Sequence, residues 1–141
     1  MIEGSGQHLI VCAAHEVDSI SREILETYPL QKNIRFLMHE WLTDRQLQRA
    51  DLLWILDASP HWSAVLPSMS AGIPILAAEW NTEIKTLFDA AGCGLSYATD
   101  TEARDCLAKL LTDQTLRRRL GDNAQSYATA HPRRALRAMT A

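Results

Sequence analysis

A histidine, a tryptophan and a serine stand side by side at positions 61–63, just after the most strand-like stretch of the chain. His61 can donate to a phosphate or a sugar hydroxyl, and the ring of Trp62 can stack on a sugar or a base. The backbone amides of Trp62, Ser63 and Ala64 are expected at the start of a helix, where anions bind. The structural alternative is a surface histidine, a tryptophan packed across the sheet edge and a serine that caps its helix.

Alternating strands and helices are predicted around these residues. Apolar runs predict strands at 8–14, 33–38, 51–57, 73–78 and 94–98, and helical periodicity predicts helices at 19–28, 44–49, about 63–71, 82–91, 101–111 and 113–130. Because the strands are apolar on both faces, we expect a parallel sheet with helices on each side. The predicted fold is a three-layer, doubly wound, Rossmann-like α/β domain over residues 8–141, and the glycine-rich residues 1–7 are expected to be a flexible leader.

Open parallel sheets bind ligands at the carboxyl ends of their strands. The loops after residues 14, 38, 57 and 78 are therefore the expected functional region. The last of these loops carries Trp80 and Asn81, and either Asn81 or Thr82 is expected to cap the helix that follows. Pro67 is expected to lie in the first turn of its own helix, because a proline further inside a helix is destabilising. That helix is accordingly predicted to begin near Ser63 or later.

The composition excludes several classes of protein. The chain has 141 residues, 47% of them hydrophobic and 22% charged, which is the balance of a globular domain. A net charge of −3 argues against nucleic acid as a partner, and no apolar run is long enough to cross a membrane. We expect a cytoplasmic protein without membrane contact, in which the arginines at 117–119 lie on a solvated helix face.

The three cysteines, Cys12, Cys93 and Cys106, form no CxxC pair. They are expected to be reduced, buried thiols and not part of a zinc site or a disulfide framework. The sequence predicts neither a bound metal nor a cofactor.

Several segments resemble, in consistent order, the C-terminal domain of the GT-B glycosyltransferases, in particular the retaining enzymes of family 4 (group 1 type) that use nucleotide sugars. The matching segments are 8–14, 33–59 (ending in ADLLWILDAS), 66–78 (LPSMSAGIPILAA), 92–98 and 107–128 (LAKLLTDQTLRRRLGDNAQSYA). The resemblance implies half of a two-domain enzyme, with the nucleotide sugar as substrate and the acceptor bound by another domain or a partner subunit.

The resemblance also assigns roles to individual loops. In that family the loop corresponding to Met38 and His39 presents backbone atoms to the nucleotide base, and amides at a helix start hold phosphate. A pair of glutamates flanks that helix start, and the second of them binds the donor ribose. Aligned on the downstream Gly72, the two glutamates fall at Ser59 and Pro67, so both carboxylates are absent here.

The resemblance further implies that the first strand and helix of the family domain are missing, together with the Arg and Lys that they supply for the diphosphate. Loss of that unit would bare a face or an edge of the sheet, so self-association or a partner is expected.

Three functions remain open at this point. The first is a nucleotide-sugar donor-binding domain that is inactive without a second domain or partner. The second is a catalytically inactive Rossmann-like protein-interaction module, which the missing glutamates favour. The third, a deoxyribosyltransferase-like enzyme, lacks the required carboxylate nucleophile. No catalytic residue is assigned, and the predicted donor-binding residues are Met38, His39, Ser59, His61, Trp62, Ser63, Ala64, Trp80 and Asn81.

Overall fold

The computed structural model describes residues 8–13, 34–38 and 49–131. The leader at 1–7, the helix predicted at 19–28 and His39 lie outside these residues. The helix predicted at 44–49 also lies outside them, apart from Arg49, which is in a turn.

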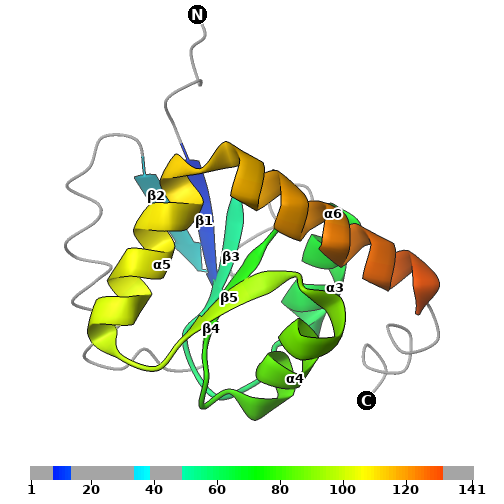
Figure 1. Ribbon diagram of the computed structural model, residues 1–141, viewed down its shortest axis with the longest axis horizontal. Helices are drawn as coiled ribbons and strands as arrows, with labels where there is room; N and C mark the ends of the chain where they lie inside the picture. Colours follow the sequence, from blue (N-terminus) through cyan, green and yellow to red (C-terminus); the bar gives the residue numbers. More distant parts are fainter. Residues whose placement is uncertain (1–7, 14–33, 39–48, 132–141) are drawn as a thin grey trace, which may run out of the picture.

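Five strands form one sheet in the order β2-β1-β3-β4-β5 (Figure 1), and the parallel pairing predicted from their apolar sequences is confirmed. The strands are β1 (His8–Ala13), β2 (Ile34–Met38), β3 (Leu52–Ile55), β4 (Ile75–Ala78) and β5 (Gly94–Tyr97). Cys12 of β1 lies opposite both Met38 of β2 and Trp54 of β3, so these three strands pair without a gap.

The fourth strand is shorter than the predicted range of 73–78. The Ile73 amide donates to the Ser68 carbonyl at 2.9 Å, so Ile73 belongs to the turn that ends the preceding helix. Pro74 has no amide hydrogen to donate, although its carbonyl accepts from the Leu53 amide at 3.0 Å. Regular strand pairing therefore begins only at Ile75.

Four helices are described: α3 (Trp62–Ser70), α4 (Thr82–Ala91), α5 (Asp100–Thr112) and α6 (Gln114–Ala130). Gly72 and Gly92 follow α3 and α4 with φ angles of 76° and 63°, which confirms both as helix-ending residues. The predicted start of α3 is wrong by one residue. Because α3 begins at Trp62, Pro67 lies beyond the first turn and leaves the Ser63 carbonyl without its i+4 amide donor.

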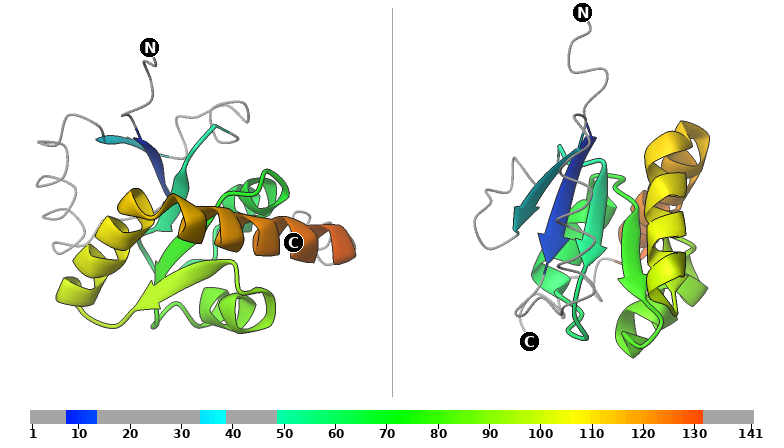
Figure 2. Two further views of the ribbon diagram at one scale, coloured as in Figure 1. Left: turned by 45° about the horizontal axis from the view of Figure 1, so that its top comes forward. Right: turned by 90° about the vertical axis from the view of Figure 1, so that its left-hand side faces the viewer.

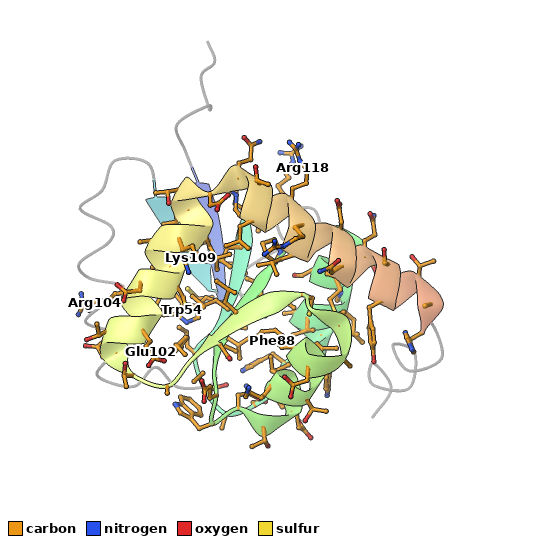
Figure 3. All side chains as sticks on the ribbon, viewed as in Figure 1. Trp54, Phe88, Glu102, Arg104, Lys109 and Arg118 are labelled. Atoms are coloured by element: carbon orange, nitrogen blue, oxygen red, sulfur yellow. The ribbon has the colours of Figure 1, made fainter. Side chains whose placement is uncertain are left out.

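Two apolar layers cover the sheet, because successive strand residues point to opposite faces. Val11, Leu53 and Ile55 pack with α3 and α4 on one face. Leu52 and Trp54 pack with α5 on the other (Figure 3). The described residues thus form the predicted three-layer α/β Rossmann-like fold.

Helix α6 passes from one layer to the other. Leu120 packs in the layer of α5, whereas Ala124, one turn later, is buried in the layer of α3 and α4. Gly121, between them, lies against the backbone of Gly72, just before β4. Helix α6 therefore crosses the edge at which the strands begin, which Figures 1 and 2 show from three directions.

Candidate functional site

The loop between β3 and α3 is organised by an aspartate and a histidine four residues apart. One oxygen of Asp57, Oδ1, lies 2.6 Å from Nε2 of His61 and accepts the Ser59 amide at 3.2 Å. Because an ionised carboxylate only accepts hydrogen bonds, Nε2 carries the hydrogen in this pair. The His61 side chain is 8% exposed and that of Asp57 20% exposed, so the contact lies largely below the surface.

His61 also has an unusual backbone. Its φ is 48° and its ψ 51°, the left-handed region that non-glycine residues avoid. From this conformation its carbonyl accepts the amides of both Ala64 and Val65 at 2.9 Å. His61 is thus the N-cap of α3, and its side chain makes no capping hydrogen bond. The expectation that Ser63 caps this helix is therefore wrong, and Ser63 is exposed in the first turn.

Asn81 joins this loop to the loop after β4. Its side-chain amide donates to the carbonyls of Asp57 and Ser59, both at 3.0 Å, and its side-chain oxygen accepts the Ile84 amide at 3.3 Å. Asn81 is therefore the cap of α4, which settles the choice between Asn81 and Thr82. It is also fully buried, so its side chain has no surface with which to touch a ligand.

The start of α3 differs from the other described helix starts. Side chains of Asn81, Thr99 and Asp113 cap α4, α5 and α6 by accepting an amide hydrogen. Within residues 49–131 no acceptor forms a hydrogen bond with the backbone amides of Trp62 or Ser63. The amide of Ala64, predicted as a third donor, is already bonded to the His61 carbonyl. The first turn of α3 carries no acidic residue, so its partial positive charge is not offset from within that turn.

A tight turn after β4 presents a tryptophan at the surface. The Glu79 amide donates to the Tyr97 carbonyl at 2.8 Å, and the Asn81 amide donates to the Ala78 carbonyl at 3.0 Å. Between these two fixed points Trp80 is 48% exposed, the largest exposed apolar side chain among the described residues. The residues on both sides of Trp80 are thus hydrogen-bonded through their backbones, while its indole is exposed.

The remaining predicted site residues occupy different surroundings. Trp62 is partly buried and packs against the layer of α3 and α4, as the structural alternative proposed. Met38 ends β2, which is separated from β3 by β1, so its backbone lies roughly 10 Å from that of Trp54 by ordinary strand spacing. Asn81 therefore bonds Ser59 directly, whereas His61 is joined to both of them through Asp57. Met38 stands apart from this group.

Metal and thiol chemistry find no support in the described residues. Those residues contain no group of three or more His, Cys, Asp or Glu side chains able to hold a metal ion. Burial raises the pKa of the Cys12 thiol strongly and that of Cys93 to about 12, so neither is a thiolate at neutral pH. Burial also raises the pKa of Cys106. No helix in the described part of the chain has the length and apolarity needed to cross a bilayer.

Sequence reasoning missed the bonds that hold the site together. Asp57 could be recognised as a loop-capping aspartate, but its contact with His61 depends on a backbone conformation that no residue type there predicts. The bridge from Asn81 to the preceding loop joins residues 22 and 24 positions apart. The only sequence signal for it is an asparagine placed directly before a helix.

No protein-family model and no curated protein matches the chain. Solved structures do match. WaaG, a glycosyltransferase involved in lipopolysaccharide biosynthesis, matches with a TM-score of 0.66 and 19% identity over 89% of this chain and 43% of its own. The glycotransferase of kitacinnamycin matches with a TM-score of 0.60 and 13% identity over 90% and 40%. The glycosyltransferase SnogD from Streptomyces nogalater matches with a TM-score of 0.56 and 15% identity over 89% and 38%.

These matches define the fold. The described residues have the α/β Rossmann-like fold of a domain of these glycosyltransferase structures. The chain spans about two fifths of the length of these structures.

Proposed function

We propose that this chain is the nucleotide-sugar donor-binding domain of a GT-B-type glycosyltransferase, of the retaining family 4 type that its motifs resemble. Glycosyl transfer then requires an acceptor-binding domain or partner subunit in addition to these residues. The donor is a substrate, and no cofactor is required.

The observation that carries the proposal is the open start of α3 at the carboxyl edge of a parallel sheet. Two backbone amides, those of Trp62 and Ser63, have no acceptor within residues 49–131, and the helix dipole adds positive potential there. Such a helix start favours a phosphate group. The glycosyltransferase-like fold makes the diphosphate of a nucleotide sugar the most suitable ligand.

Trp80 and Met38 extend the proposed site on either side of the amides. The exposed indole of Trp80 provides an apolar face on which a sugar ring or a base can stack. The backbone at Met38, two strands away from β3, is placed to meet the far end of an extended donor. The absence of the two glutamates at Ser59 and Pro67 predicts weaker binding of the ribose than in the family that the motifs resemble.

One observation favours the alternative, a protein-interaction module without chemistry. The side chains of His61 and Asn81, both predicted to bind the donor, are mainly engaged with the protein itself. If these contacts serve only folding, the loop has no need of a ligand. Binding experiments distinguish the two functions.

Calorimetric titration with UDP-, GDP- and ADP-sugars tests the proposal directly. We expect one nucleotide series to bind and to quench tryptophan fluorescence. Replacing Trp80 with alanine should weaken that binding roughly 5- to 150-fold, since stacking of a base on an aromatic ring contributes about 1–3 kcal/mol. Gln114→Ala, an exposed change at the start of α6, is the control and should leave the affinity unchanged. Absence of binding by the folded protein across all three series would refute the donor-binding function and favour the interaction module.

A further inference from the structure

The most completely bonded polar side chain near the proposed site belongs to Asn81. It is 0% exposed, and its amide and carbonyl groups together make three hydrogen bonds, two to the loop after β3 and one to the first turn of α4. A side chain placed in this way cannot contact a ligand, yet a cap for α4 alone would need only the bond to Ile84. Serine, threonine or aspartate could supply that bond equally well.

The two additional bonds end on the loop that carries His61. The carbonyls of Asp57 and Ser59 flank the turn in which Asp57 Oδ1 accepts the Ser59 amide and meets His61 Nε2. An asparagine is required here, because only an uncharged amide offers two hydrogens to two carbonyls and an acceptor to a third group. Aspartate at this position would place a negative charge against both carbonyl oxygens.

We propose that Asn81 is a positioning residue. It holds the loop after β3 in the conformation that keeps His61 left-handed and leaves the amides of Trp62 and Ser63 without an acceptor within residues 49–131. The left-handed backbone of His61 is unfavourable for a residue that carries a Cβ, so the surrounding bonds must maintain it. Through Asn81, the loops after β3 and β4 form one unit rather than two independent segments.

Two amides report on the two parts of this arrangement, and a third serves as a control elsewhere in the protein. The Ser59 amide, bonded to Asp57, reports on the loop after β3. The Ile84 amide reports on the cap of α4, and the Leu116 amide reports on the cap of α6, provided by Asp113 at the opposite edge of the sheet. Hydrogen exchange followed by NMR measures all three amides in a single sample, without any ligand.

Asn81→Ser separates positioning from capping, because serine can still accept the Ile84 amide but cannot bridge to the two carbonyls. We expect the Ser59 amide to exchange roughly 10-fold faster or more, the imidazole ¹⁵N shifts of His61 to change, and the Ile84 amide to stay protected. Asn81→Ala should accelerate hydrogen exchange at both the Ser59 and the Ile84 amides. Asp113→Ala, which removes the cap of α6, is the matched control. It should accelerate hydrogen exchange only at the Leu116 amide and leave the His61 imidazole shifts unchanged.

A wild-type measurement protects the test against a variant that does not fold. The side-chain amide hydrogens of Asn81 should exchange slowly and show through-hydrogen-bond couplings to the carbonyl carbons of Asp57 and Ser59. Wild-type exchange at Ser59 and unchanged His61 shifts in Asn81→Ser would overturn the proposal, as would rapidly exchanging Asn81 amide hydrogens in the native chain.

The significance of this arrangement for a ligand rests on the proposed donor-binding function. In a chain that binds a nucleotide sugar, Asn81→Ser should weaken binding roughly 10-fold while Asp113→Ala does not; equal affinities would show that the loop is held but does not position the donor site. If no nucleotide sugar binds while the exchange pattern holds, the proposed function fails and the role of Asn81 in the loop stands.

Discussion

The two edges of the sheet are built differently. At the edge where the strands begin, side chains of α6 donate hydrogen bonds to backbone carbonyls at the ends of the other helices. Asn123 donates to Gly92, Gln125 to Ser70, and Arg117 to Leu110 and Leu111. At the edge where the strands end, Asn81 and Asp57 fix the loops from within, and the amides of Trp62 and Ser63 remain without such partners in residues 49–131.

We expect the amino edge to contribute mainly to stability and the carboxyl edge mainly to ligand binding. The amino edge directs its polar groups toward the protein and closes over the sheet with a glycine-to-glycine contact. At the carboxyl edge, Asn81 joins the loops after β3 and β4, and Trp80 is exposed. The proposed binding site lies at this edge. Changes at the amino edge should therefore affect the free energy of unfolding, and changes at the carboxyl edge should affect affinity.

The largest effect is expected from Gly121→Ala. A Cβ at this position would lie 2.0 Å from the carbonyl oxygen of Gly72, which is a backbone atom and cannot turn away as a flexible side chain could. Alanine favours a helix over glycine by about 1 kcal/mol, but relieving such a contact requires α6 to move away. We expect the free energy of unfolding to fall by about 3 kcal/mol, measured by urea denaturation.

Ser126→Ala, an exposed change in the same helix, serves as the control and should change stability by no more than about 0.5 kcal/mol. A stabilised Gly121→Ala protein would show that α6 does not rest on Gly72, and the contrast between the two edges would then lose its structural basis.

Ser63→Asp should move affinity and stability in opposite directions. An aspartate in the first turn of α3 complements the helix dipole and should stabilise the fold by about 0.5 kcal/mol. The same charge repels a phosphate at the neighbouring amides, so nucleotide-sugar affinity should fall about tenfold by calorimetry. Gln114→Asp, in the first turn of α6, should stabilise similarly and leave affinity unaltered. Equal affinities of both variants and the wild type would place the phosphate elsewhere.

Arg117→Ala is expected to have the smallest effect of the three. Arg117 Nη1 lies 2.6 Å from the Leu110 carbonyl and 3.0 Å from that of Leu111, and the side chain is half-buried, so its removal should reduce the free energy of unfolding by about 1 kcal/mol. Arg118, which projects outward from α6 in Figure 3, is the matched control, and its replacement should have almost no effect. Thermal denaturation of the two alanine variants measures this difference. Equal stabilities of the two variants would mean that Arg117 is as solvated as Arg118.

Sequence reasoning succeeded where local chemistry determines the structure. The bounds of α4 and the glycines that end α3 and α4 follow from an N-cap, a hydrophobic periodicity and residues that tolerate a positive φ. The parallel sheet follows from strands that are apolar on both faces. Each of these signals lies within a short segment, so the remainder of the fold is not needed to interpret it.

The predictions that failed or were incomplete depended on tertiary contacts. Pro67 suggested a later start for α3, because the left-handed backbone of His61, supported by Asp57 and Asn81, was not foreseen. Asn81 was predicted to touch the donor, whereas the structure buries it between two loops. The arginines at 117–119 were expected to share one solvated face, but Arg117 reaches back to the end of α5.

The most direct test of the binding edge is an amide NMR titration of the wild-type chain with UDP-, GDP- and ADP-sugars. A donor-binding domain predicts saturable shifts of the Trp62 and Ser63 amides, while Leu116, at the amino edge, stays in place. A folded sample in which Trp62 and Ser63 remain unmoved by every nucleotide sugar would contradict the assignment of this edge as a donor site.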